Sequence, residues 1–331
     1  MTDVVIRGKP GETVNSGELL EGVYDVEVYA YSYEGKKIGY GKKGDVRVAD
    51  GETTLISVGI SEIKEPAFND DDRPSIGTKA RTEPKEVGDI VFSDGSATPY
   101  TAGMTITDEM KENAIALIFY KGTGLNNGSD TTTVRTLGVG LKHYKENHGN
   151  TTEIGSLWCT EAASAKAVDV TTIHCEPDDE GSIGNYTFVN ATDRNGSDNL
   201  EQIASFLTQN NKTDDTSTAE NYPAFYFCKN YKDTASNVSG TDYESGWYLP
   251  TIAELFQIYK NGKDAGKIFD IDAAIQAVGG DTLAYVYWSS TQTPASSGQG
   301  YACFAKFNTG EVKHNSYKFN TYYAVCAIRE F

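Results

Sequence analysis

Alternating apolar and polar residues mark the start of the chain, where residues 1–63 predict β-structure only. The stretch VYDVEVYAYSYEG places Val26, Val28 and Ala30 on one face, and the turn sequences EG, KKG and ADGE separate it from further strands. A strand with one apolar face is typical of an antiparallel sheet with one buried side. Because the segment contains no cluster of titratable residues, we expect a small β-sandwich-like spacer or stalk.

This pattern stops in residues 64–86, which contain three prolines and an acidic run. That composition predicts a linker. The run Asp70, Asp71 and Asp72 lacks the alternating acidic pattern and distal glutamate of a calcium-binding loop, so we interpret it as a solvated charge run.

From residue 87 onward the pattern predicts a larger domain that extends to residue 331. VGDIVFSDGSATPY predicts two short strands around a turn at Asp94 and Gly95, while the apolar runs in ENAIALIFYKG and GVGLK predict buried strands. Residues 145–198 are mostly irregular in pattern. A segment of that length without regular structure is either functional or held by many contacts.

Three helices are predicted in the second half of the chain. DNLEQIASFLTQN begins at the N-cap candidate Asp198, PTIAELFQIYKNG carries a capping box of Thr251 and Glu254, and DIDAAIQAVGG ends at Gly279. Strands, then helices, then strands again indicate an α+β fold with helices packed on a mostly antiparallel sheet.

The C-terminal stretch, residues 285–331, combines strand patterns with a run of polar and aromatic residues. Residues 285–288, 301–307 and 324–331 read as strands. The residues between them resemble an antibody paratope in composition, since Tyr gives contact area at little entropic cost and Asn and Ser give adaptable hydrogen bonds. An ordinary solvated β-surface is the alternative, because the chain has 21 tyrosines and β-surfaces favour Tyr. The paratope-like residues are Tyr301, Asn308, His314, Asn315, Tyr317, Asn320, Tyr322 and Tyr323.

The formal net charge of −18 argues against nucleic-acid binding, because such a field repels phosphate backbones. No apolar run approaches the length of roughly 18 residues that a transmembrane helix needs, so no transmembrane segment is expected. The N-terminal sequence MTDVVIRGKP lacks the apolar region of a signal peptide. We expect any targeting segment to be absent from the chain or already removed.

Cysteines and histidines show no spacing that indicates a metal site. The histidines His143, His148, His174 and His314 form no HExxH pattern, so we predict no metal and no cofactor. No Ser/His/Asp or Cys/His set stands out either, and we predict no catalytic residue. Five cysteines without CxxC spacing argue against a dense disulfide framework, and one must be unpaired in the monomer. They are Cys159, Cys175, Cys228, Cys303 and Cys326.

Several motifs in the second half of the chain together resemble a known family. They are GWYLPTIAELFQIY at residues 246–259, YWSST at residues 287–291, and then YACFAKFNTGEV and VCAIREF near the end. In this order they resemble the C-type-lectin-like fold of the formylglycine-generating-enzyme branch. More narrowly, they are similar to the variable proteins of diversity-generating retroelements. The resemblance runs from about residue 87 to residue 331 and is strongest in the C-terminal part.

That resemblance implies a non-catalytic display protein, in which a rigid scaffold holds a C-terminal variable region whose codons are rewritten at adenines. Asn codons of the AAC type then yield residues such as Tyr, Ser, His, Cys and Phe, but not Lys, Glu, Gln, Trp or Met. The implied ligand-binding residues are Ser296, Ser297, Tyr301, Cys303, Asn308, His314, Asn315, Tyr317, Phe319, Asn320 and Tyr322.

The resemblance also implies which residues stay fixed. Trp247, Leu249, Pro250 and Trp288 belong to the scaffold, where core packing is the interpretation we favour. Lys306, Glu311, Lys313 and Lys318 are of types that the AAC route does not produce, and they are assigned to the fixed part as well.

A protein or cell-surface ligand is the implied partner, bound by the variable region. The implied location is a bacterial cell surface, with lipid anchoring through an N-terminal segment outside this chain. Lys313, His314 and Lys318 would form a small cationic island that favours an acidic partner, although few exposed charges contribute little.

Three other functions remain as alternatives. A formylglycine-generating-type enzyme requires a close cysteine pair, whereas Cys303 and Cys326 lie far apart in the sequence. A calcium-dependent lectin is suggested by Glu176, Pro177 and Asp178, which resemble a Glu-Pro-Asn motif but lie upstream of the predicted helices and lack a Trp-Asn-Asp partner. With Asp179 and Glu180, Asp178 still offers ligands for a structural cation. The third is a structural adhesin without a specific pocket.

Overall fold

The chain divides into two compact units, Met1–Arg73 and Pro74–Phe331. The computed structural model describes residues 13–15, 17–31, 37–58, 61–62, 75–128, 130–147, 154–178, 183–293 and 300–331. The sequence placed residues 75–86 in the linker, but they belong to the second unit. Lys79 forms a bridge with Ala97, and the backbone N–H of Gly77 donates to Ser96 Oγ at 2.8 Å.

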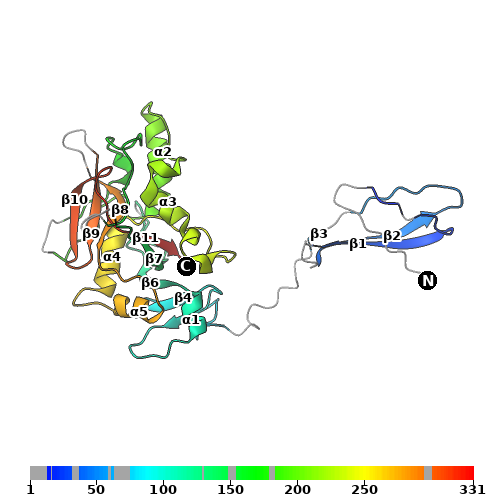
Figure 1. Ribbon diagram of the computed structural model, residues 1–331, viewed down its shortest axis with the longest axis horizontal. Coiled ribbons are helices and arrows are strands. Elements are labelled where there is room, and N and C mark those ends of the chain that lie inside the picture. The colour runs from blue at the N-terminus through cyan, green and yellow to red at the C-terminus, as the bar shows by residue number, and fades with distance from the viewer. Residues whose placement is uncertain are drawn as a thin grey trace. The chain divides into compact units, whose positions relative to one another are not determined.

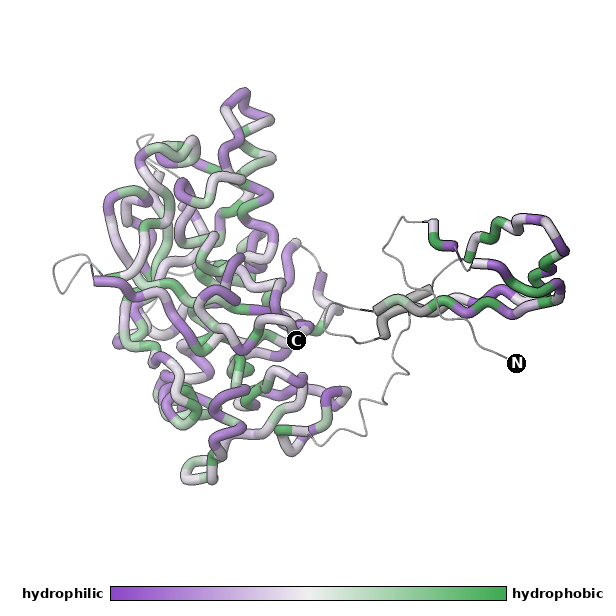
Figure 2. The backbone as a smooth tube through the Cα atoms, turned by 45° about the vertical axis from the view of Figure 1, so that its right-hand side comes forward, coloured by the Kyte–Doolittle hydropathy of each residue, from purple (hydrophilic) through white to green (hydrophobic). Residues whose placement is uncertain are grey.

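The first unit is an antiparallel sheet in the order β1-β2-β3. Val46 is buried, whereas Val26, Val28 and Ala30 of β1 are only half-buried. Figure 2 shows the alternation of hydrophilic and hydrophobic stretches along this ribbon. The described residues therefore make one sheet with a shallow apolar face, and the second sheet of a sandwich is not among them. The strands are β1 (Gly22–Tyr31), β2 (Lys37–Val48) and β3 (Ser61–Glu62).

A five-stranded antiparallel sheet, ordered β11-β7-β6-β4-β5, forms the centre of the second unit. The C-terminal strand returns to the sheet made by the first strands of the unit, with Val325 opposite Tyr144 and Ile328 opposite Val139. The strands are β4 (Asp89–Phe92), β5 (Ala97–Pro99), β6 (Ala114–Gly122), β7 (Arg135–Tyr144) and β11 (Val325–Glu330).

Both faces of this sheet are covered, which explains the continuous apolar run of β6. Leu117 and Phe119 face one core together with α4 and α5, while Ile118 faces the other with α2 and α3. The helices are α1 (Asp108–Asn113), α2 (Asn199–Gln209), α3 (Pro223–Lys229), α4 (Ile252–Gly262) and α5 (Ile271–Ala277).

A second sheet, ordered β10-β9-β8, packs against the first through α4, which contacts β6, β8 and β9 (Figure 1). Its strands are β8 (Val286–Gln292), β9 (Tyr301–Lys306) and β10 (Glu311–Tyr317). The α+β class with mostly antiparallel sheets is confirmed, as are the helices α2, α4 and α5. The sequence missed α1 and α3, which have six and seven residues and are too short for a helical period to show.

A buried polar network fixes the start of α4. Thr251 and Glu254 form the predicted capping box, and the Glu254 carboxylate also accepts from Arg135 Nη1 at 3.2 Å and from Tyr248 Oη at 2.8 Å. Its second oxygen accepts from the backbone N–H of Gly196 at 3.1 Å. The network joins α4 to β7 and to the irregular segment before α2. None of the described helices is both long and apolar enough to cross a membrane.

Candidate binding face

The paratope-like residues converge where β9 begins and β10 ends. Tyr301 and Tyr317 lie opposite each other, with ring centroids 4.9 Å apart and hydroxyl oxygens 3.3 Å apart. The ring of Phe319 follows at 6.2 Å from Tyr317. Together with Asn320 and Tyr322 in the loop after β10, these half-exposed or exposed side chains and the β10 residues His314 and Asn315 form what we call the C-terminal face.

A bulge in β10 turns two of these residues outward. The register with β9 shifts between Lys313 and Ser316, and the two residues in between, His314 and Asn315, are both exposed. Bulges commonly re-aim side chains next to functional sites. The hydroxyl of Thr293 donates to the carbonyl oxygen of His314 at 2.9 Å and holds the bulge in place.

The C-terminal face rests on an aromatic floor. The Tyr323 ring lies 4.6 Å from that of Trp288 and 4.7 Å from that of Phe304, and its hydroxyl is 2.9 Å from Ser316 Oγ. Trp288 is fully buried and donates from Nε1 to the carbonyl oxygen of Ser156 at 2.9 Å. Sequence analysis grouped Tyr323 with the surface residues, whereas the structure places it partly in the core.

Cys303 does not belong to the C-terminal face, contrary to the expectation from sequence. Its side chain is only 1% exposed and packs into the core against α4. Burial raises the pKa of its thiol. In β9 the neighbours Ala302 and Phe304 pack into the opposite core, so the strand is covered on both sides there and leaves Cys303 no route to solvent.

Asn308 is exposed but lies away from the other face residues. It follows β9 in the turn to β10, a strand length from Tyr301, or about 20 Å at 3.3 Å per residue. Ser296 and Ser297 lie outside the described residues.

The predicted cationic island does not form, because Lys318 is fully buried. Lys313 Nζ pairs with Glu311 at 2.8 Å, and the same carboxylate pairs with Lys306 at 2.6 Å. This cross-strand triad lowers the pKa of Glu311 through its two lysine partners. Lys313 therefore shares its counter-charge with Lys306, and the group of Lys313, His314 and Lys318 does not form an exposed cluster.

Lys318 sits instead beneath the C-terminal face. Its Nζ donates to the carbonyl oxygens of Ala165 at 2.5 Å and Val168 at 3.1 Å, and lies 4.9 Å from the ring centroid of Trp158. Burial lowers the pKa of Lys318 to about 8. Strand alternation gives only a short-range signal for this burial, since Ser316, two residues earlier, is buried as well, whereas the bulge reverses the alternation before it and leaves His314 exposed.

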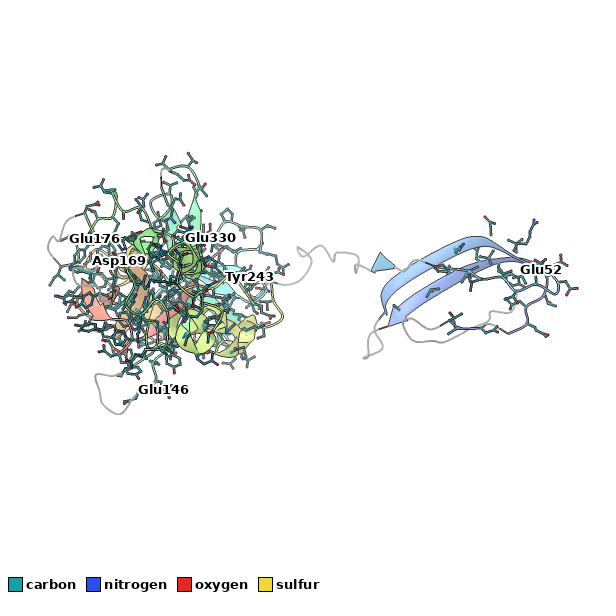
Figure 3. The ribbon with its side chains drawn as sticks, turned by 90° about the horizontal axis from the view of Figure 1, so that it is seen from above. Glu52, Glu146, Asp169, Glu176, Tyr243 and Glu330 are labelled. Carbon is teal, nitrogen blue, oxygen red and sulfur yellow. The ribbon has the colours of Figure 1, made fainter. Side chains whose placement is uncertain are left out.

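Residues outside the C-terminal stretch flank the face, and sequence analysis missed them. Lys166 Nζ lies 6.0 Å from the ring of Phe319. Near Tyr322, the Tyr144 hydroxyl hydrogen-bonds to the carboxylate of Glu146, and burial together with this carboxylate raises the pKa of Tyr144 to about 12. In Figure 3 Glu146 projects from the edge of the unit. These residues belong to or border the irregular segment, whose pattern gives no hint of its neighbours.

The four expected scaffold residues are all buried. Trp247 donates from Nε1 to the carbonyl oxygen of Tyr243, and the carbonyl oxygen of Pro250 accepts from the backbone N–H of Ser290 at 2.8 Å. Leu249 and Trp288 pack in the same core. These positions are thus tied to the β-sheets through both their backbone and their side chains.

The acidic segment after Cys175 has a structural use in the described part of the chain. The Asp178 carboxylate accepts from the backbone N–H groups of Val189 at 2.6 Å and Asn190 at 2.8 Å, which closes a turn. Asp179, Glu180 and the run Asp70 to Asp72 lie outside the described residues. Within those residues, no group of three or more His, Cys, Asp or Glu side chains is placed to hold a metal ion.

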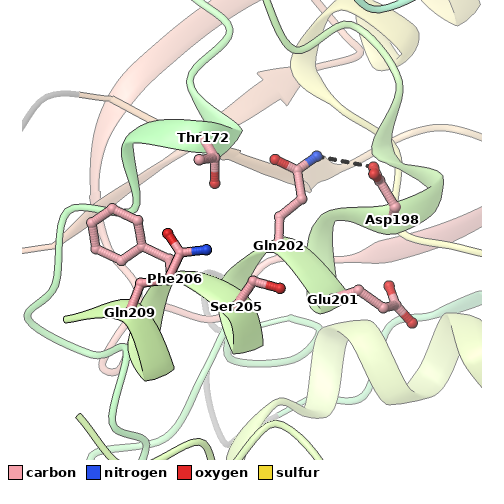
Figure 4. Close-up of a pocket in the computed structure, with 7 residues that line it drawn as sticks. All are labelled: Thr172, Asp198, Glu201, Gln202, Ser205, Phe206 and Gln209. Carbon is pink, nitrogen blue, oxygen red and sulfur yellow. Dashed lines mark hydrogen bonds between the residues drawn. The ribbon is translucent and has the colours of Figure 1, made fainter. Parts of the chain in front are cut away.

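A shallow groove of about 200 Å³ runs between α2 and the irregular segment (Figure 4). Gln202 Nε2 donates to Asp198 there at 2.9 Å, and most of the other lining side chains are exposed and polar. A small-molecule site needs more apolar enclosure than this groove offers. The lining residues are Thr172, Asp198, Glu201, Gln202, Ser205, Phe206 and Gln209.

Comparison with known proteins gives little further guidance. No protein-family model and no curated protein matches the chain. Among solved structures, the chain is similar to a fimbrial protein from Bacteroides ovatus ATCC 8483, at 17% identity and a TM-score of 0.41. The match covers 74% of this chain and 49% of that chain, so it spans about half the length of the fimbrial protein. At this identity and score the likeness assigns neither family nor function.

Proposed function

We propose that the chain is a non-catalytic ligand-binding protein that displays a diversifiable C-terminal face on a C-type-lectin-like scaffold. The observation that carries the proposal is the layering at this face. Tyr301, Tyr317 and Phe319 make an aromatic cluster at the surface, with exposed Asn and His side chains beside it and fully buried Trp288 beneath. Binding residues on a packed scaffold can change without loss of the fold.

The chemistry of the C-terminal face suits a protein or cell-surface ligand. Rigid aromatic anchors with adaptable amide neighbours are typical of paratopes and of interface hot spots. A surface location with lipid anchoring remains part of the proposal, and it is supported only by the sequence resemblance. The finer lectin-like assignment rests on the same resemblance and is compatible with the return of β11 to the sheet of β4, β6 and β7.

The chemistry of the cysteines disfavours the enzyme alternative. All five are free and buried in the described structure, and burial raises the pKa of Cys159 to about 12 and that of Cys326 well above the usual range. A cysteine nucleophile reacts as the thiolate and therefore needs a lowered pKa.

Comparison of the C-terminal coding sequence among related strains, together with any nearby near-copy, tests the diversification directly. We expect substitutions at adenine-bearing codons of Tyr301, His314, Asn315, Tyr317 and Asn320, with residues 246–259 and Trp288 unchanged. Free variation of Lys306 or Lys318 would contradict the assignment of the fixed residues. Evenly scattered differences would reduce the C-terminal face to an ordinary β-surface.

A display library provides a test that needs no knowledge of the ligand. We expect most clones randomised to AAC-derived residues at His314, Asn315, Tyr317, Phe319 and Asn320 to fold, because these side chains are exposed or half-exposed. Folding is measured as protease resistance on the surface of yeast.

The matched control library carries the same residue choices at Trp247, Leu249, Pro250 and Trp288, where we expect almost no folded clones because all four are buried. Equal survival in the two libraries would contradict the separation into face and scaffold.

A further inference from the structure

Lys318 joins the C-terminal face to a loop that is distant in sequence, residues 163–168. Its Nζ donates to two carbonyl oxygens of this stretch, those of Ala165 and Val168. In the opposite direction, the backbone N–H of Cys159 donates to the carbonyl oxygen of Lys318 at 3.1 Å. The side chain and the backbone of one residue therefore hold the irregular segment at two points.

The packing around Lys318 is close on the side of Gly300. Gly300, which immediately precedes β9, lies so close that an added Cβ would come within 2.4 Å of Lys318 Cε and 2.6 Å of the Lys166 carbonyl oxygen. A glycine is required there because the lysine stem and the loop backbone both press against it. Lys318, Gly300 and the loop thus form one close-packed unit.

The charged groups around the ammonium compensate it only in part. Cys159 lies nearby with a thiol that burial keeps protonated, and Asp169 acts on Lys318 through space while its Oδ1 lies 2.5 Å from His174 Nε2. Lys166 points outward, with 39% of its side chain exposed. Among the described residues, the groups in direct polar contact with the ammonium are two carbonyl oxygens and the ring of Trp158.

Such an arrangement is a poor way to gain stability alone. Taking a charge out of water costs several kcal/mol, and buried ionic groups can often be replaced by apolar side chains of similar volume without loss of stability; in some proteins such groups are retained for conformational specificity. What the contact of Lys318 with the loop determines is the position of Lys166. The loop presents it 6.0 Å from the ring of Phe319.

We propose that Lys318 is a positioning residue that fixes residues 163–168 against the C-terminal face, and that Lys166 is thereby a constant cationic contact for acidic groups of the ligand. Lys166 suits this role because its ion-pair partner Glu161 lies 4.0 Å away, whereas Lys306 and Lys313 share Glu311 at 2.6 and 2.8 Å. The contact of Lys166 with a ligand rests on the proposed binding function. The fixing of residues 163–168 by Lys318, which we call the clamp, does not.

Amide hydrogen exchange of the full chain tests the clamp. In Lys318→Met we expect the amides of Lys166 and Val168, which donate within this loop to the carbonyl oxygens of Ala163 and Ala165, to exchange at least about tenfold faster than in the wild type. Lys111→Met, at a 48% exposed lysine of α1, is the matched control and should leave them unchanged. Unchanged protection in Lys318→Met would overturn the clamp.

A pH series on the unmodified protein provides a second readout if Lys318→Met does not fold. The pKa of Lys318, lowered by burial to about 8, places the loss of the ammonium between about pH 7 and pH 9. Over this range we expect hydrogen exchange of the two loop amides to accelerate more than that of unstructured peptides of the same sequence, in step with the lysine signal in nuclear magnetic resonance. An acceleration equal to that of the peptides, with Lys318 seen to titrate, would overturn the clamp as well.

The role of Lys166 is tested on clones selected from the face library against bovine serum albumin, an acidic protein used as the probe. We expect Lys166→Ala to weaken the binding of most selected clones about tenfold or more, and Lys111→Ala to leave it unchanged. Binding that is indifferent to Lys166 would overturn the contact role. Failure to select any binder would count against both that role and the proposed function, while amide exchange would still decide the clamp.

Discussion

Replacing Glu254 with alanine should lower the free energy of unfolding of the second unit by about 3–5 kcal/mol, the cost typical of breaking a buried ion pair. The substitution leaves the Arg135 guanidinium buried without its carboxylate partner and removes the acceptor of the Tyr248 hydroxyl. It also frees the backbone N–H groups of Thr251 and Gly196, which donate to the same side chain at 2.8 and 3.1 Å.

Chemical denaturation followed by tryptophan fluorescence measures this loss, because the three tryptophans of the chain all lie in the second unit. Asp108→Ala is the control. Its carboxylate is 95% exposed and 3.6 Å from Lys111, so we expect a change of at most about 0.5 kcal/mol. Glu254→Gln keeps the shape and part of the hydrogen bonding, and it should fall between the two. A loss for Glu254→Ala no larger than that of the control would show that the network does not stabilise α4.

The second large effect is expected at Trp288, where substitution by alanine should lower the free energy of unfolding of the second unit by about 3–5 kcal/mol. The indole is fully buried, lies 4.6 Å from Tyr323, and donates to the carbonyl oxygen of Ser156. Its loss removes the floor of the C-terminal face and one of the two hydrogen bonds to the Ser156 carbonyl oxygen, which still accepts from the backbone N–H of Tyr323 at 3.1 Å.

The control for Trp288→Ala is a triple variant in which His314, Asn315 and Asn320 are replaced by alanine. All three side chains are exposed, so we expect each substitution to change the free energy of unfolding by no more than about 0.5 kcal/mol. Trp158 and Trp247 remain as fluorescent reporters in both variants. A triple variant as unstable as Trp288→Ala would mean that the exposed residues carry the fold, which is incompatible with a freely varying surface.

Local signals in the sequence predicted much of the fold. The capping box of Thr251 and Glu254 located α4, and the apolar run before Gly122 located β6. Both signals are reliable because the residues that determine the helix start or the buried strand lie within a few positions of it in the sequence. By contrast, α3 is a single short helix that begins at Pro223 after a 3₁₀ turn, and its position depends on packing against β11.

The candidate site was predicted in composition but only partly in geometry. Tyr301, Tyr317 and Phe319 do gather, whereas Cys303 points into the core and Lys318 is buried under the face. Residue type misled the assignment in these two cases, because a reachable codon says nothing about burial and a lysine is expected at the surface. The contributions of Lys166 and Trp158 depend on contacts between distant segments, which a single sequence does not reveal.

The return of β11 to β7 makes translation of the last strand a condition for folding. Ile328 and Cys326 lie in one core, Val325 and Ala327 in the other, and both cores stay open until this strand leaves the ribosome. A frameshift or premature stop anywhere in the segment before it would leave the edge of β7 exposed and the chain open to proteolysis. If the C-terminal face is rewritten as proposed, frame errors made in that process would thus be removed as unfolded protein, and the copies that persist would be those read through in frame.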